Sequence, residues 1–148
     1  MGIKMKIVLL DTLTFGETDL SAFDALGEVE VYQTTAQEET QGRIINATVI
    51  VTNKVLITKE LMQNSASLKL ICVAATGTNN VDLKAAKELG IVVKNVAGYS
   101  TDSVIQHTFS MLFYLLGHSR YYDESVKDKT YSKSPIFTDV SHPFFEVK

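Results

Sequence analysis

The sequence predicts a doubly wound α/β fold with five parallel strands, a long helix after the last strand and an irregular tail. Two observations lead to this prediction. Short apolar runs without polar alternation indicate strands that are covered on both faces, as in parallel sheets. A helix-like segment separates each run from the next, which is the order that parallel strands need for their crossover connections.

The first elements follow from local composition. Residues 5–11 are aliphatic and β-branched and end in the acid Asp11, so they are predicted to form the first strand. Residues 21–26 are predicted to form a short helix that Gly27 ends. Residues 28–32 alternate between apolar and polar side chains, which predicts the second strand.

The middle of the chain continues the alternation. Residues 38–47 are predicted to be helical, and the apolar residues 48–52 form the predicted third strand. A helix is expected over residues 58–63, with the Thr58 hydroxyl as its N-terminal cap.

The last elements complete the sheet. Residues 68–75 are the predicted fourth strand, and a helix over 82–89 is expected to end at Gly90. Residues 91–96 are the fifth strand, and the longest helix is expected at 101–120. Five strands with single helices between them favour a flavodoxin-like sheet with helices on both faces.

Composition limits the class of protein. At 148 residues, with 45% apolar and 21% charged residues, the chain has the profile of one globular domain. A net charge of -3 without a basic stripe argues against nucleic acid as a partner. No apolar run reaches the roughly 18 residues that a membrane span needs. The single cysteine, Cys72, lies in an apolar run, so we expect it to be inert in the core and the protein to be cytoplasmic.

Residues 121–148 differ from the rest of the chain. They are polar and aromatic, contain both prolines and show no clean period. We therefore expect a linker or arm that packs on another domain or subunit. The expected division is 1–100 as the substrate-binding part, 101–120 as an interdomain helix and 121–148 as the arm.

The first candidate site is the turn of Thr76, Gly77 and Thr78, called the 76–78 turn below. In an open parallel sheet, ligands bind beyond the carboxyl ends of the strands. Gly77 lacks Cβ, so it can take a positive φ and lets a ligand approach the backbone. The three N–H groups are expected to converge on a carboxylate or phosphate. The alternative is a simple strand-to-helix turn, capped by Asn79, Asn80 or Asp82.

Two further segments are candidates. Asn53 and Lys54 end the third strand, and this strand end opens onto the same crevice. Lys54 would add a positive charge there. The alternative is that Lys54 is an ordinary solvated lysine of a loop. The segment 98–104 leads into a helix that is apolar around much of its circumference, which is typical of helices buried on two sides. The three histidines have no carboxylate or cysteine at ligand spacing, so no metal site is predicted.

Three stretches carry a resemblance to a known family: "VTNKVLIT" from Val51, "ATGTNNVDLKAAKELGIVVKNV" from Ala75 and "GYSTDSVIQHTFSMLFYLL" from Gly98. They resemble the D-isomer-specific 2-hydroxyacid dehydrogenases, and most closely the glycerate dehydrogenase (hydroxypyruvate reductase) branch. The resemblance covers nearly the whole chain. The sequence departs from the family pattern at three positions, where an aspartate, a proline and a glutamate are common: Asn79, Ala97 and Gln106.

The resemblance implies specific roles. The backbone of Thr76 and Gly77 would bind the carboxylate of a 2-oxo or 2-hydroxy acid, and Asn53 and Lys54 would line the same pocket. Thr76 would also lie near the cofactor, NAD or NADP, and Val104 would face its nicotinamide. The helix 101–120 would cross between domains and join a homodimer.

The same resemblance implies that the cofactor-binding loop and the catalytic residues of the family are not part of this sequence. Family members continue into a dinucleotide-binding loop and later supply a catalytic arginine, glutamate and histidine, so no catalytic residue is assigned here. We expect the chain alone to bind no cofactor tightly and to have no turnover. Two other classes stay open: a receiver-like signalling domain, for which Asn53 stands where the phosphorylated aspartate is needed, and a non-catalytic domain that binds small acids.

Overall fold

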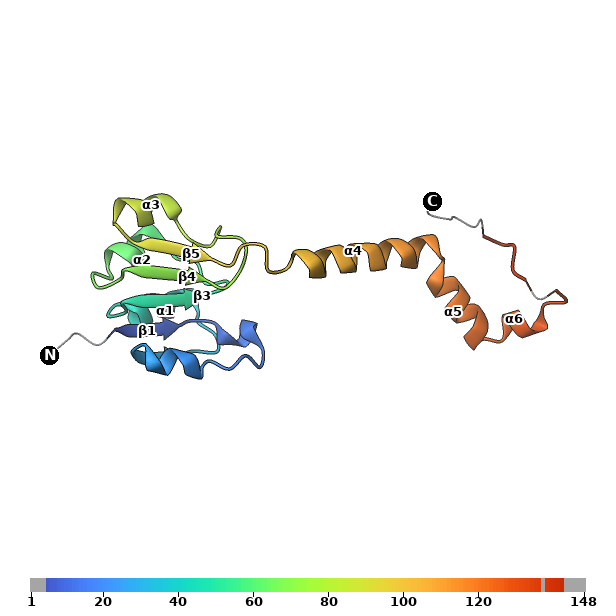
Figure 1. Cartoon of the computed structure of the whole chain (residues 1–148), viewed down its shortest axis with the longest axis horizontal. Coiled ribbons are helices and arrows are strands. Elements are labelled where there is room, and N and C mark those ends of the chain that lie inside the picture. The colour runs from blue at the N-terminus through green and yellow to red at the C-terminus, as the bar shows by residue number, and fades with distance from the viewer. Residues whose placement is uncertain (1–4, 137, 143–148) are drawn as a thin grey trace. The chain divides into compact units, whose positions relative to one another are not determined.

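The computed structural model describes residues 5–136 and 138–142. The chain divides into two compact units, Met1–Tyr99 and Ser100–Lys148. The first unit contains the sheet, and the second contains the long helix and the segments that follow it (Figure 1).

The first unit is built on a sheet of five parallel strands in the order β2-β1-β3-β4-β5 (Figure 1). The strands are β1 (Lys6–Leu9), β2 (Glu28–Val31), β3 (Val49–Thr52), β4 (Leu70–Val73) and β5 (Val92–Asn95). This order confirms the flavodoxin-like prediction. The chain order reverses between β1 and β3, which is where α/β sheets of this kind bind their ligands.

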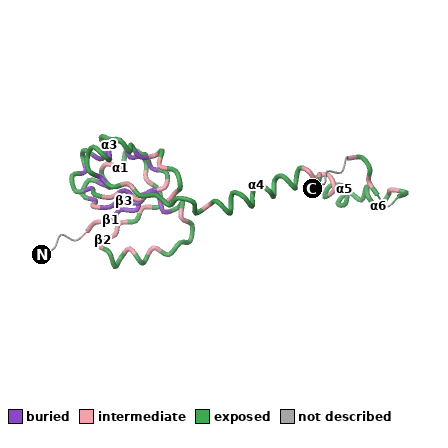
Figure 2. The backbone as a smooth tube through the Cα atoms, turned by 45° about the horizontal axis from the view of Figure 1, so that its top comes forward, coloured by how far each residue is buried: buried purple, intermediate pink, exposed green. Residues whose placement is uncertain are grey.

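Three helices cover one face of the sheet: α1 (Gln37–Ile44), α2 (Lys59–Gln63) and α3 (Leu83–Glu88). Alternate strand residues such as Val8, Ile50 and Ile71 are in register and fully buried against these helices. Figure 2 shows that buried residues are concentrated in and around the sheet. The predicted Thr58 cap is confirmed, since Thr58 Oγ1 accepts the Leu61 N–H. Of the three residues considered as the cap of α3, Asp82 has this role, since its Oδ1 accepts the Ala85 N–H.

The opposite face is covered by the segment between β1 and β2. It contains two short 3₁₀ helices, η1 (Thr12–Phe15) and η2 (Ser21–Ala25). The short helix predicted at 21–26 is present as η2, with 3₁₀ geometry, whereas η1 was not predicted. Leu20 and Phe23 both pack on this face, and their spacing of three residues matches the three-residue turn of a 3₁₀ helix.

Cys72 lies on this second face and is partly buried. Burial raises the pKa of its thiol, so the protonated form dominates at neutral pH. This agrees with the interpretation of Cys72 as a packing residue.

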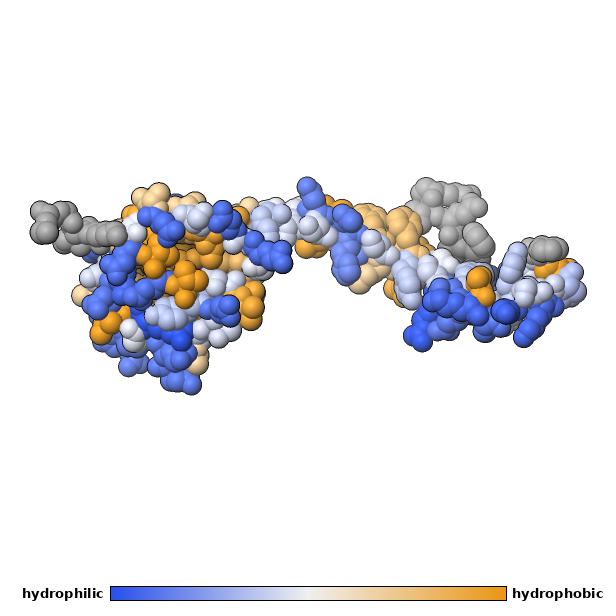
Figure 3. Space-filling model, turned by 90° about the horizontal axis from the view of Figure 1, so that it is seen from below, coloured by the Kyte–Doolittle hydropathy of each residue, from blue (hydrophilic) through white to orange (hydrophobic). Residues whose placement is uncertain are grey.

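In the second unit the long helix α4 (Thr101–Leu116) ends four residues before the predicted Arg120. The reason is His118, which takes φ 47° and ψ 37° in the left-handed region and so redirects the chain after Gly117. None of the residues of α4 is buried within its unit, and apolar side chains are exposed along it (Figure 3). No helix in the described part of the chain is long and apolar enough to cross a membrane.

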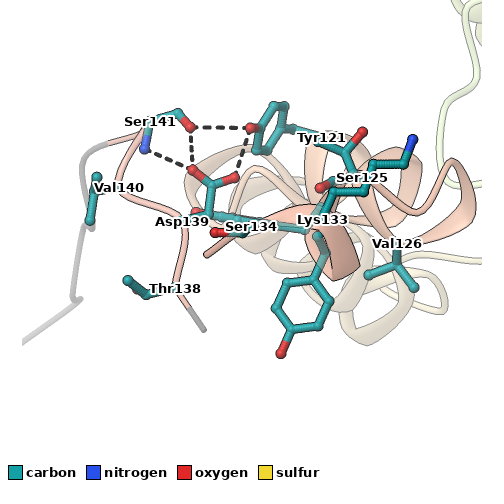
Figure 4. Close-up of a pocket in the computed structure, with 12 residues that line it drawn as sticks. Tyr121, Ser125, Val126, Lys133, Ser134, Thr138, Asp139, Val140 and Ser141 are labelled. Carbon is teal, nitrogen blue, oxygen red and sulfur yellow. Dashed lines mark hydrogen bonds between the residues drawn. The ribbon is translucent and has the colours of Figure 1, made fainter. Parts of the chain in front are cut away.

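The tail is more regular than the sequence indicated. Helices α5 (Ser119–Lys127) and α6 (Thr130–Lys133) occupy much of it, and α5 carries the i,i+4 ion pairs Arg120–Glu124 and Lys127–Asp123. The Tyr121 hydroxyl donates to Asp139 at 2.7 Å and so holds the segment after α6 beside α5 (Figure 4). Residue 137 and residues 143–148 of the predicted arm 121–148 lie outside the described residues.

Candidate functional site

The 76–78 turn follows β4 at the carboxyl edge of the sheet and is held by the end of β5. The Asn95 side-chain amide donates to the Thr76 carbonyl at 2.6 Å, and the Thr76 hydroxyl donates to the Val96 carbonyl at 3.3 Å. The Val96 N–H donates in turn to the Ala75 carbonyl at 3.0 Å. The hydroxyl and carbonyl of Thr76 are therefore used to fix the turn.

The N–H groups of the turn remain available. Within the described residues, the N–H groups of Thr76, Gly77 and Thr78 donate to no protein acceptor. Thr76 and Gly77 are also exposed. Successive free amides of this kind bind carboxylates and phosphates. The Asp82 cap of α3 does not compete with this role, because it uses the Ala85 N–H and leaves the turn amides free.

The positive φ that was expected for Gly77 is not observed. The glycines with a positive φ in the described chain are Gly16, Gly90 and Gly98, so Gly77 does not need glycine for its backbone angles. A Cβ on Gly77 would lie 2.9 Å from Asn79 Oδ1, which is the far end of a flexible side chain.

Asn53 and Lys54 lie at the end of β3, and their backbone is held by Asp11. The carboxylate of Asp11 is 5% exposed and accepts the Asn53 N–H at 2.9 Å and 3.1 Å and the Lys54 N–H at 2.6 Å. The N–H groups of Asn53 and Lys54 are therefore not available to a ligand. Sequence reasoning did not assign this role to Asp11, although an acid that ends an apolar strand is a usable signal.

The Asn53 side chain has a property that is common in functional sites. Its Oδ1 atom is buried and has no hydrogen-bond partner in the described part of the molecule. An unpaired buried acceptor is costly, so its presence calls for a reason such as ligand binding.

The loop after β3 is tied to the loop after β4. The Ile57 N–H donates to the Asn80 carbonyl at 2.7 Å, the Asp82 N–H donates to the Ile57 carbonyl at 3.1 Å, and the Asn80 side chain donates to Val55 at 3.1 Å. With Asp11 on one side and β5 on the other, the loops at this edge form a connected frame. Such a frame keeps the turn amides in place before a ligand arrives.

The remaining predicted residue, Val104, lies on α4 in the second unit and is 59% exposed. Its position beside a nicotinamide stays a prediction, as does the cofactor contact of Thr76. Among the described residues, no group of three or more His, Cys, Asp or Glu side chains is arranged to hold a metal ion.

Comparison with known proteins bears on these observations. Residues 7–139 match the family model described as "D-isomer specific 2-hydroxyacid dehydrogenase, catalytic domain". The chain is 34% identical to a hydroxypyruvate reductase of Blautia hydrogenotrophica, over 97% of this chain and 46% of that protein. It is 33% identical to a glycerate dehydrogenase of Methylorubrum extorquens, over 96% of this chain and 45% of that protein.

A solved structure of a dehydrogenase is also similar to this chain. The D-lactate dehydrogenase of Aquifex aeolicus, complexed with NAD and lactic acid, superimposes with a TM-score of 0.70 and 25% identity, over 87% of this chain and 39% of that chain. The present chain spans less than half the length of each of these three proteins. The match to the family model covers most of the chain, and the resemblance predicted from the three sequence stretches is confirmed: the chain belongs to the D-isomer specific 2-hydroxyacid dehydrogenase family.

Proposed function

We propose that the chain is the substrate-binding portion of an NAD(P)-dependent oxidoreductase that interconverts a D-2-hydroxy acid and a 2-oxo acid. The observation that carries the proposal is the set of free amides in the 76–78 turn, on a frame that belongs to this family. The relatives named as hydroxypyruvate reductase and glycerate dehydrogenase favour hydroxypyruvate and glycerate as the acid pair. The expected location is the cytoplasm.

Each candidate residue has a distinct part in the proposal. The amides of Thr76 and Gly77 bind the substrate carboxylate and fix its orientation. Asn53 and Lys54 line the same pocket, and the Lys54 ammonium draws the anion towards this edge of the sheet. Thr76 and Val104 border the nicotinamide.

The cofactor is NAD or NADP, which supplies hydride chemistry at C2 of the acid. The chain contains no glycine-rich dinucleotide loop, so its own residues bind and orient the acid and do not hold the cofactor tightly. No residue of this chain is proposed as catalytic. The receiver-like alternative is disfavoured, because both oxygens of Asp11 are engaged by backbone N–H groups and β3 is followed by Asn53.

The purified chain is expected not to oxidise NADH in the presence of hydroxypyruvate. The absorbance of NADH at 340 nm measures this activity. A chimera that joins the chain to the remaining part of the Blautia hydroxypyruvate reductase is expected to regain this activity. NADH oxidation by the chain alone would refute the assignment of a substrate-binding portion. A folded chimera that binds NADH but reduces no 2-oxo acid would refute the proposed reaction.

We further propose that α4 joins two copies of the protein in a homodimer. The support is its apolar surface, with side chains such as Phe109 and Leu115 more than half exposed within their unit. Phe109→Glu is expected to weaken self-association at least about tenfold in sedimentation equilibrium. Val126→Glu on α5, also an exposed apolar position, is the matched control. A monomer at all concentrations, or equal effects of the two changes, would contradict the proposal.

A further inference from the structure

A pocket of about 730 Å³ lies in the second unit, between α5, α6 and the segment 138–141, and is called the arm pocket below. The two helices line one side of it and the segment lines the other (Figure 4). Its volume is within the range of sites that bind small molecules. The lining includes neither the 76–78 turn nor Asn53 and Lys54, so the arm pocket is a different site from the proposed acid site.

Contacts within the unit hold the two sides of the arm pocket together. The Tyr121 hydroxyl donates to the Asp139 carboxylate at 2.7 Å, and the Ser141 N–H donates to the same carboxylate at 2.8 Å. The His142 ring stacks on the His118 ring with centroids 4.5 Å apart, and it meets the Tyr121 ring in a T-shaped arrangement at 4.3 Å. The segment is therefore fixed against α5 before a ligand arrives, which lowers the cost of binding.

The charges of the lining do not select for an ion. Apart from the tyrosines, its ionisable residues are Lys133 and Asp139, whose charges are opposite. The Asp139 carboxylate is already engaged by the Tyr121 hydroxyl and the Ser141 N–H. A phosphate or another multiply charged anion would find a single lysine here. An uncharged ligand fits this lining best.

The polar side chains of the lining are mainly hydroxyls, and that of Ser125 is the most informative. Ser125 is 9% exposed, and its hydroxyl makes no hydrogen bond with any residue that the structure describes. Helical serines and threonines commonly donate to the carbonyl four residues earlier, as Thr108 and Ser110 do on α4. A buried hydroxyl needs a partner, and for Ser125 a ligand in the pocket can supply it.

The tyrosines of the lining add aromatic rings beside these hydroxyls. Tyr121 and Tyr122 lie on α5 with ring centroids 5.2 Å apart and ring planes 76° apart, and Tyr131 on α6 is 48% exposed. The face of an aromatic ring is negatively polarised, so it attracts the polarised C–H groups of a sugar ring. Hydroxyls both donate and accept, as sugar hydroxyls do. A flat aromatic ligand would contact the rings but leave most of the lining hydroxyls without a partner.

We propose that the arm pocket binds an uncharged carbohydrate of one or two rings. The Ser125 hydroxyl forms a hydrogen bond with a sugar hydroxyl, and the Tyr131 ring packs on the C–H face of a sugar ring. The site lies outside the proposed dehydrogenase reaction and does not depend on it.

The test is a titration of the ¹⁵N-labelled chain with cellobiose, a neutral sugar of two rings, followed by amide chemical shifts. The amides of Tyr122, Ser125 and Thr138 are expected to shift with a common saturation curve. Benzyl alcohol, which has an aromatic ring and a single hydroxyl, is expected to leave these amides unchanged at the same concentrations.

Matched variants separate the pocket from general effects. Ser125→Ala and Tyr131→Ala are each expected to weaken cellobiose binding about fivefold, because one loses a hydrogen bond and the other a ring contact. Ser132→Ala is the control for the first, since the Ser132 hydroxyl already donates to the Lys129 carbonyl at 2.9 Å and does not line the pocket. Tyr99→Ala, at an exposed position of the first unit, is the control for the second.

Three results would overturn the carbohydrate site: an absence of saturating shifts, wild-type affinity in either pocket variant, or equal shifts with benzyl alcohol. The hydroxypyruvate response of the 76–78 turn is measured separately, and its loss would refute the proposed function alone.

Discussion

Replacing Asp11 with alanine is expected to lower the free energy of unfolding of the sheet unit by about 3 kcal/mol. The buried carboxylate accepts the backbone N–H groups of Asn53 and Lys54, which lie 42 and 43 residues away in the sequence. Alanine leaves the Asn53 and Lys54 N–H groups without this part-buried acceptor. It also removes the link between the loops after β1 and β3, so the frame around the 76–78 turn loosens as well.

Urea denaturation followed by far-UV circular dichroism measures this effect. Asp19→Ala is the matched control, because Asp19 also accepts a backbone N–H, from Ser21 at 2.9 Å, but is exposed to water. The control is expected to cost less than about 1 kcal/mol, since water can replace the lost acceptor. An equal loss of stability in both variants would show that Asp11 does not hold the frame.

Replacing Gly77 with aspartate is expected to weaken hydroxypyruvate binding by about a hundredfold. The new carboxylate would lie beside the amides that bind the substrate carboxylate, and like charges about 4 Å apart near a protein surface repel by up to about 4 kcal/mol. Folding is expected to change little. Gly77 has a φ outside the left-handed region and is exposed, and the nearest obstacle is the mobile end of the Asn79 side chain.

Two companion variants make this result specific. Gly42→Asp adds the same charge on α1, where a Cβ meets no atom within 4 Å, and is expected to leave acid binding unchanged. Gly77→Ala adds bulk without charge and is expected to have an intermediate effect. Calorimetric titration with hydroxypyruvate compares the three, and wild-type affinity in Gly77→Asp would exclude the turn as the acid site.

The fold was predictable because its signals are local. Runs such as 48–52 and 68–75 are apolar without alternation, and that pattern requires cover on both faces of the sheet. The Thr58 cap was recognisable from residue type and position before a helix, whereas Asp82 was one of three candidates for the cap of α3. The position of Gly77 at a strand end pointed to the 76–78 turn, and the family resemblance then implied its role.

Other features depend on contacts that no local pattern reveals. The bond from Asp11 to the end of β3 joins residues that are far apart in the sequence, and so does the bond from Gln37 to Leu56. The end of α4 depends on the left-handed conformation of His118, which is uncommon for a residue other than glycine. Helix α5 is a different case, because its i,i+4 ion pairs Arg120–Glu124 and Lys127–Asp123 are local and the sequence analysis did not use them.

The central claim is that the amides of the 76–78 turn are free of protein acceptors and form the binding site for a small organic acid. An amide-resolved NMR titration of the unchanged chain with hydroxypyruvate tests it most directly. The account predicts that the Thr76, Gly77 and Thr78 signals shift together to saturation and that these amides exchange rapidly with solvent before the acid is added. Slow exchange of these amides in the free chain, with signals that do not respond to the acid, would contradict it.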